Sequence, residues 1–153
     1  MSLYMEISTC LLVITSNPED LLQIRRSFAK EQLLVEGLTT MFDFYVEQYL
    51  SQMSENRLFS HILLDLDMGY QPALDIVSLL KRHPLTRHIP LTVYSQYQSA
   101  CLIRLVEEYG VNTYLVRSYG WPATAKVVKG ICRRAEQVAS GRCKAAFSSK
   151  AAA

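Results

Sequence analysis

Two acidic residues stand at the end of a short apolar run, where they could bind a cation or take part in chemistry. The run His61–Leu64 has the pattern of a buried strand, and Asp65 and Asp67 follow it. In an open sheet of parallel strands, ligands bind just beyond the carboxyl ends of the strands. Carboxylate oxygens are also ligands that Mg²⁺ prefers in proteins. The sequence therefore predicts a functional site at Asp65 and Asp67.

A second apolar run reaches the same edge with neutral side chains. Residues 10–15 end at Thr15, and Ser16 and Asn17 follow. Hydroxyl and amide groups hold a cation weakly because they carry no net charge. The first strand therefore brings hydroxyls and an amide, not acids, to the edge where Asp65 and Asp67 lie, so we expect a cation there to be held weakly.

Strand and helix patterns alternate along the chain and must position these residues. The predicted strands are residues 10–15, 33–38, 61–65, 89–94 and 113–116. The predicted helices are residues 18–31, 40–51, 72–83, 99–109 and 121–139. The second helix is expected to place Met41, Phe44, Tyr45 and Tyr49 on one inward face, with Met53 as a further candidate for it. Alternating elements with near-continuous apolar strands predict an α/β fold, a doubly wound five-stranded parallel sheet in the flavodoxin-like order 2-1-3-4-5 with helices on both faces.

Length and composition indicate one globular domain. The chain has 153 residues, of which half are hydrophobic and a fifth charged, so a sizeable core is expected. We assign residues 5–139 to one domain and residues 140–153 to a basic, flexible tail. The net charge of +2 makes nucleic acid an unlikely partner by composition. The bases gathered after residue 126 are interpreted as a solvated helix face.

The sequence predicts no signal peptide, and it contains no apolar run of the ~20 residues that a membrane helix needs. Its four cysteines, Cys10, Cys101, Cys132 and Cys143, form no C-x-x-C pair. Reduced thiols in a cytoplasmic protein without membrane contact are the expectation from this pattern.

Four stretches, in this order and spacing, carry a family resemblance. They are Leu11-Leu-Val-Ile-Thr-Ser-Asn-Pro18, Ile62-Leu-Leu-Asp65-Leu-Asp67-Met68, Arg87-His-Ile-Pro-Leu-Thr-Val-Tyr94-Ser95 and Gly110-Val-Asn-Thr-Tyr114-Leu-Val-Arg117. Over nearly all of residues 10–139 the chain resembles a response-regulator receiver domain of the CheY type. The resemblance implies a stand-alone receiver in two-component or phosphorelay signal transduction, which acts by binding proteins and is not an enzyme.

The resemblance also implies a role for several residues. Asp65 is at the position that accepts a phosphoryl group from a histidine kinase, and the position of Asp67 lends its backbone carbonyl to Mg²⁺. Ser95 is at the position that binds the new phosphoryl oxygens and moves with them. Tyr114 is at the position of an aromatic ring that swings inward on activation. Arg117 stands where the family has a lysine that pairs with the phosphoryl group.

The chain departs from the family pattern at the metal site. Thr15 and Ser16 replace the two acids that hold Mg²⁺, and Ser118 replaces the proline that follows the lysine position. Phosphoryl transfer needs a metal and cations to neutralise the equatorial oxygens. Impaired Mg²⁺-dependent phosphorylation is therefore expected, and a pseudo-receiver that works without phosphate is the alternative. An Asp65–Arg117 ion pair is hypothesised, since a guanidinium pairs well with a carboxylate.

Aromatic residues crowd one short region of the chain, residues 94–121. Tyr97, Tyr109, Tyr119 and Trp121 are candidates for a protein interface because Tyr and Trp are enriched at binding hot spots, although some of these rings must be core. The partners implied are a sensor histidine kinase or phosphotransfer protein, an unidentified downstream protein, and a second copy in a homodimer.

A flavodoxin-like cofactor-binding protein is the other class considered. It needs a phosphate cradle at a helix N-terminus after the first strand. Residues 15–18 contain hydroxyls but no glycine, and Pro18 removes a backbone donor. No G-x-G-x-x-G or Walker A motif is present, so an FMN protein is the weaker interpretation.

Overall fold

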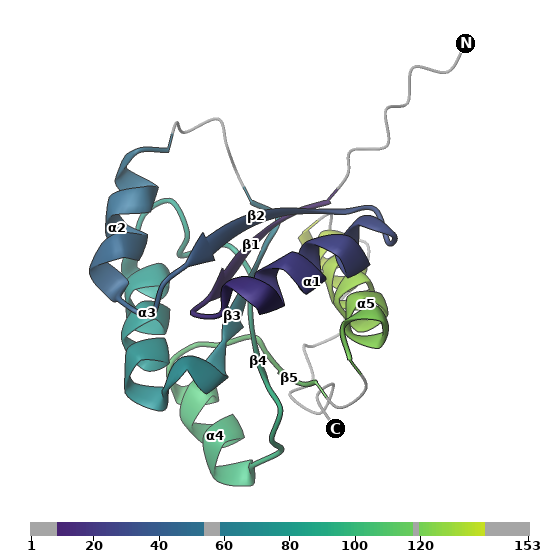
Figure 1. Cartoon of the computed structure of the whole chain (residues 1–153). Helices are drawn as coiled ribbons and strands as arrows, with labels where there is room; N and C mark the ends of the chain where they lie inside the picture. Colours follow the sequence, from purple (N-terminus) through teal and green to yellow (C-terminus); the bar gives the residue numbers. More distant parts are fainter. Residues whose placement is uncertain (1–8, 54–58, 118–119, 140–153) are drawn as a thin grey trace.

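The computed structural model describes residues 9–53, 59–117 and 120–139 and has an α/β architecture (Figure 1). The strands are β1 (Thr9–Thr15), β2 (Leu33–Thr39), β3 (His61–Asp65), β4 (Leu91–Ser95) and β5 (Thr113–Val116). The helices are α1 (Pro18–Ala29), α2 (Asp43–Ser51), the 3₁₀ turn η1 (Leu66–Met68), α3 (Tyr70–Arg82), α4 (Ala100–Glu108) and α5 (Trp121–Ala139). All neighbouring strands are parallel in the order β2-β1-β3-β4-β5, which confirms the predicted fold class and strand order.

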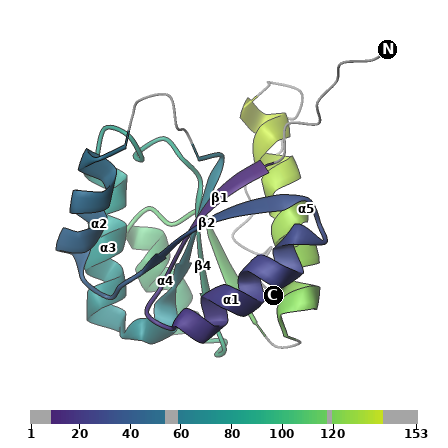
Figure 2. The same cartoon turned by 45° about the horizontal axis from the view of Figure 1, so that its top comes forward.

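Helices cover both faces of the sheet, as Figures 1 and 2 show. Successive side chains of a strand point to opposite faces, so each apolar strand supplies two cores. In β1, Leu12 and Ile14 pack with α2, α3 and α4, whereas Leu11 and Val13 pack with α1 and α5. This division explains why the inner strands are apolar at almost every position instead of alternating.

The central strand β3 is buried along its whole length, from His61 to Asp65. It pairs with β1 on one side and with β4 on the other. The strand therefore carries a carboxylate at its end with no freedom to shift, because a one-residue slip would exchange the two cores.

Helix α2 turns a different face inward from the one predicted. Val46 and Leu50 are its buried residues, with Tyr49 and Met53 partly buried against the same core. These four residues have the i, i+3, i+4, i+7 spacing of a helix stripe. The expectation for Met41, Phe44 and Tyr45 was wrong, because all three are substantially exposed.

The last expectations concern the tail, the domain boundaries and membrane-spanning helices. The predicted tail at residues 140–153 lies outside the described residues, and the domain boundaries remain a prediction. Among the described helices, none combines the length and apolarity needed to span a membrane.

Candidate functional site

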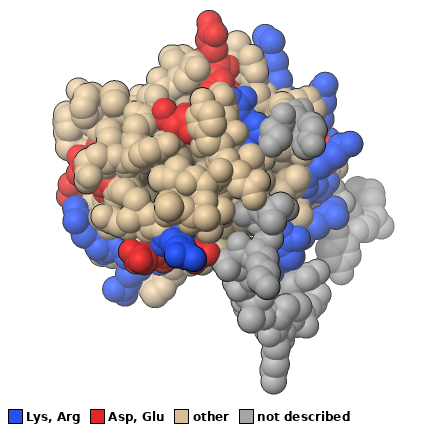
Figure 3. Space-filling model, turned by 90° about the horizontal axis from the view of Figure 1, so that it is seen from below, with Lys and Arg blue, Asp and Glu red and all other residues tan. Residues whose placement is uncertain are grey.

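The carboxyl ends of β1, β3, β4 and β5 bring the predicted site residues to one edge of the sheet. Thr15, Asp65 and Ser95 are the last residues of β1, β3 and β4, and Arg117 follows β5. Figure 3 views the molecule from this edge, where uncharged side chains cover most of the visible face. The edge is thus a largely neutral surface around a small number of polar groups.

The Asp65 carboxylate is buried and already hydrogen-bonded through both oxygens. Asp65 as a whole residue is only 5% exposed. The Thr15 hydroxyl donates to Oδ2 at 2.8 Å, and the Asp67 backbone N–H donates to Oδ1 at 2.8 Å. Burial raises the pKa of the Asp65 carboxyl above its ordinary value, and the charges of Asp67 and Asp20 add to this increase. The two hydrogen bonds oppose it.

Thr15 uses its hydroxyl as a hydrogen-bonding group inside the domain. The side chain is fully buried, and its oxygen also accepts the backbone N–H of Asn17 at 3.2 Å. The hydroxyl is therefore held between Asp65 and the start of α1. Thr15 thus supplies a donor that satisfies one oxygen of the Asp65 carboxylate.

The Asp67 side chain connects η1 to the segment after β4. Ser95 Oγ donates to Asp67 Oδ1 at 2.6 Å, and the backbone N–H of Gln96 donates to Oδ2 at 2.9 Å. Hydrogen bonds to a charged acceptor are stronger than neutral ones. The sequence predicted Asp67 as a metal-site residue, but nothing in the local pattern shows that its carboxylate lies beside Ser95.

Tyr114 belongs to the same hydrogen-bonded region. It is 3% exposed, and its hydroxyl donates to the Tyr97 carbonyl at 2.6 Å. Burial raises the pKa of the Tyr114 phenol. The Tyr97 N–H in turn donates to Ser95 Oγ at 3.1 Å. Tyr97 thus links the Asp67–Ser95 contact to the buried ring on β5.

The hypothesis of an ion pair between Asp65 and Arg117 was wrong, because the structure does not contain this contact. Among the described residues, the ion pair within 4.0 Å joins Lys129 and Glu31. The Arg117 guanidinium instead lies over the ring of Trp121, with its central carbon 4.4 Å from the ring centroid. A guanidinium stacks well on an aromatic face, and this contact draws it toward α5. Its Nε is buried without a hydrogen-bond partner.

The aromatic residues divide between core and surface. Trp121 is 2% exposed and packs edge-to-face on Tyr94 at 5.2 Å between centroids, so the expectation that it lines an interface was wrong. Trp121 is the first residue of α5 and packs into the core between this helix and the sheet, which explains its burial. Tyr97 is 63% exposed and Tyr109 38%, so both remain interface candidates. Tyr119 lies outside the described residues.

The polar groups at this edge do not make a complete site for Mg²⁺. No group of three or more His, Cys, Asp or Glu in the described part of the chain could hold a metal ion. Both Asp65 oxygens accept hydrogen bonds, and both Asp67 oxygens do as well. A cation would have to displace these donors without the second and third carboxylates that usually hold it.

The start of α1 does not favour a phosphate-bearing cofactor either. The Asn17 side chain already accepts the N–H groups of Glu19 and Asp20 at 3.0 and 3.5 Å. Two acids in the first turn repel an anion from this helix end. The interpretation as an FMN protein therefore has no support from this geometry.

Several solved structures that match this fold are response regulators. A response regulator from Thermotoga maritima matches with a TM-score of 0.67 and 14% identity, covering 83% of this chain and 99% of that one. The phosphorylated cyanobacterial phytochrome response regulator RcpA matches with a TM-score of 0.63 and 25% identity, covering 80% and 90%. The Mn²⁺-bound form of response regulator Rcp1 matches with a TM-score of 0.60 and 21% identity, covering 80% and 91%.

No protein-family model and no curated protein matches the sequence. The structural matches nevertheless agree with one another and cover most of each chain. The chain has the CheY-like receiver fold of response regulators.

Proposed function

We propose that this chain is a receiver domain of a two-component or phosphorelay system that acts by binding other proteins, with Asp65 in the phosphoacceptor position and impaired Mg²⁺-dependent phosphorylation. A sensor histidine kinase or phosphotransfer protein is the proposed upstream partner. The downstream partner is a protein that contacts the surface around Tyr97 and Tyr109. The protein performs no catalysis of its own in this proposal.

The observation that carries the proposal is the environment of Asp65. The carboxylate lies at the carboxyl end of the central strand, as a phosphoacceptor should, yet the Thr15 hydroxyl occupies one of its oxygens at 2.8 Å. Phosphorylation would need that oxygen free as a nucleophile and a cation to neutralise the incoming phosphoryl group. The missing acids at Thr15 and Ser16 remove most of the attraction for that cation.

Intact mass spectrometry after incubation with acetyl phosphate and Mg²⁺ tests this proposal. We expect the wild type to gain little of the ~80 Da adduct that marks a phosphoryl group. A variant with Thr15→Asp and Ser16→Asp should gain it at lower Mg²⁺ concentration, because two carboxylates are restored beside Asp65. The adduct should vanish when Asp65→Ala is added.

Rapid, Asp65-dependent labelling of the wild type at millimolar Mg²⁺ would contradict the impairment and keep the phosphoacceptor role. Labelling of neither protein, with the restored-acid variant shown to be folded by circular dichroism, would contradict the phosphoacceptor role of Asp65.

Signalling wholly without phosphate is the second candidate, and the contacts of Asp67 favour it. Ser95 already donates to a carboxylate, at the position where the family resemblance implies contact with a phosphoryl group. Tyr114 is already buried, with its hydroxyl bonded to Tyr97. The Asp67 side chain would then hold the segment after β4 in one arrangement that needs no modification of Asp65.

Amide NMR spectra separate the two candidates. If Asp67 holds this arrangement, Asp67→Ala should shift the amides of Ser95, Gln96 and Tyr97 and speed hydrogen exchange at Gln96. Acetyl phosphate with Mg²⁺ should leave the same wild-type amides unchanged. A shift on adding acetyl phosphate that Asp65→Ala abolishes would contradict control without phosphate.

A further inference from the structure

Three aromatic residues of α2 and the segment before it form an exposed cluster, here called the aromatic ridge. Phe42, Phe44 and Tyr45 are 54%, 56% and 47% exposed. The Tyr45 ring centroid lies 3.9 Å from that of Phe44 and 6.2 Å from that of Phe42, so the three rings form one surface. Contiguous apolar patches are uncommon on proteins that bind nothing there.

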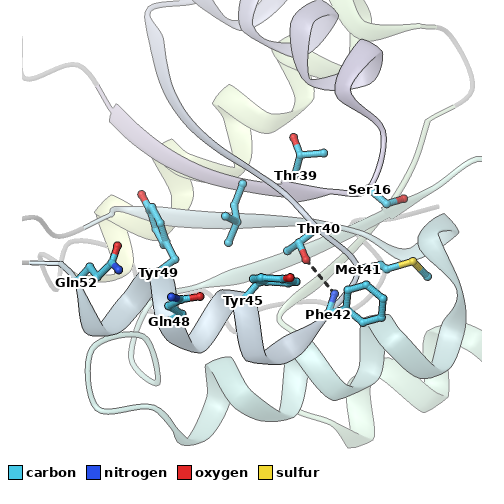
Figure 4. Close-up of a pocket in the computed structure, with 10 residues that line it drawn as sticks. Ser16, Thr39, Thr40, Met41, Phe42, Tyr45, Gln48, Tyr49 and Gln52 are labelled. Atoms are coloured by element: carbon cyan, nitrogen blue, oxygen red, sulfur yellow. Dashed lines mark hydrogen bonds between the residues drawn. The ribbon is translucent and has the colours of Figure 1, made fainter.

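A groove runs beside the aromatic ridge, between α2 and the end of β2. Its volume is about 620 Å³, and none of the described residues that line it is charged. Met41, Phe42 and Tyr45 form an apolar wall, and the amides of Gln48 and Gln52 continue it along α2 (Figure 4). The Phe42 N–H donates to Thr40 Oγ1 at 3.0 Å, which fixes the turn that presents the ridge.

Two acidic residues lie on α2 beside this apolar surface. Asp43 and Glu47 stand one turn apart next to Phe44, and α2 contains no lysine or arginine. A partner that fits should therefore be apolar at its centre and basic around it.

The exposed face of α5 has this chemistry. Val127 is 44% exposed, and a Cβ built on Gly130, one turn later, would meet no atom within 4 Å. The exposed residues Lys126, Arg133 and Arg134 flank this small apolar seam. In Figure 3 basic side chains gather on the side of the molecule where α1 and α5 lie. An aromatic ring could pack over Gly130 with bases on both sides of it.

We propose that a second copy of this chain occupies the groove, with its α5 face packed on the aromatic ridge. Figures 1 and 2 show α2 and α5 on opposite sides of the sheet, so one molecule cannot make this contact with itself. The contact joins two different surfaces and is heterologous. It produces a ring if the rotation closes and an open chain of molecules if it does not.

Sedimentation velocity over a range of concentrations and salt tests the proposal with two charge-reversal variants. One variant carries Asp43→Lys and Glu47→Lys on α2, and the other carries Arg133→Glu and Arg134→Glu on α5. All four positions are exposed or partly exposed, so both variants should keep the fold, which circular dichroism checks. The wild type should associate as its concentration rises and dissociate at 0.5 M NaCl, because salt screens surface charges.

Each variant alone should stay monomeric at concentrations where the wild type associates. An equimolar mixture should associate again, because the acidic α2 of one variant can bind the basic α5 of the other. Recovery in the mixture is specific to a contact between α2 and α5.

A wild type that stays monomeric at all concentrations would overturn the proposal. The aromatic ridge would then be a candidate surface for binding a different protein. A dimer that the α2 variant abolishes and the α5 variant does not would also overturn the proposal. The α2 surfaces of two copies would then contact each other. None of these results depends on phosphate, so they leave the receiver function to its own test.

Discussion

The buried histidine at the start of β3 should make the stability of this protein depend on pH. His61 is 1% exposed, and its Nε2 lies 2.7 Å from Thr92 Oγ1. Its Nδ1 is buried without a hydrogen-bond partner. Burial, helped by the charge of Lys81, lowers the pKa of His61 from 6.5 to about 4. The folded protein therefore keeps this ring neutral at pH values where the unfolded chain protonates it.

The sign and size of the effect follow from these two pKa values. Above pH 6.5 the ring is neutral in both states, and its contribution to the free energy of unfolding is fully present. As the pH falls below 6.5 the unfolded chain binds the proton first, and stability declines until the folded ring also protonates near pH 4. At 1.36 kcal/mol per pH unit the whole loss is about 3 kcal/mol, of which about 2.5 kcal/mol is reached by pH 4.5.

Urea unfolding at pH 7.0 and pH 4.5, followed by circular dichroism, measures this loss. The matched control combines His61→Leu with Thr92→Val, which replaces both buried polar partners by apolar groups of similar size. Carboxylates titrate in both proteins, so the difference between the two pH-dependent losses isolates His61. A wild type that loses no more stability than the control between these pH values would refute the assignment of a neutral, buried His61.

Three further predictions concern the site and its supports. Thr15→Val should lower the free energy of unfolding at pH 7 by about 1–3 kcal/mol in urea titrations, because Asp65 keeps its buried carboxylate with one donor fewer; an unchanged midpoint would contradict the buried hydrogen bond. Gly69→Ala should cost about 1–3 kcal/mol by thermal unfolding, because Gly69 has φ of 121° before α3, whereas Gly130→Ala in the open face of α5 should not destabilise. Tyr114→Phe should lower the free energy of unfolding by about 0.5–1.5 kcal/mol, because the hydrogen bond to the Tyr97 carbonyl is lost. Tyr97→Phe keeps that carbonyl and serves as the control, so equal effects of the two substitutions would contradict the prediction.

The sheet and the order of its strands were predictable because each strand is marked by its own apolar run in the sequence. Five apolar runs separated by helix-length segments leave few chain topologies that bury every run. The strand His61–Asp65 has the predicted bounds, and Thr113–Val116 does as well. Helix faces are less certain when apolar residues outnumber the positions that can be buried. In and just before α2, apolar residues lie on two faces, one with Phe44 and Tyr45 and one with Val46 and Leu50. The second face is buried because it packs against the core that α3 and the sheet form.

The candidate site was predictable in its positions and not in its contacts. The ends of parallel strands meet at one edge, so the sequence could bring Thr15, Asp65 and Ser95 together without coordinates. Arg117 shows the limit of such reasoning. Charge alone favoured pairing with Asp65, but the guanidinium has an aromatic face available on Trp121, four residues later at the start of α5.

The sequence by itself determined the fold class, the strand order and the hydroxyl residues Thr15 and Ser16 at the end of the first strand, because periodicity and residue type are properties of the chain. Only the tertiary structure decided that Thr15 satisfies Asp65, that Asp67 holds Ser95, and that the aromatic ridge faces outward. Hydrogen bonds and burial depend on which side chains approach within a few ångströms, and residues 28 or 50 positions apart in the chain carry no local record of that approach.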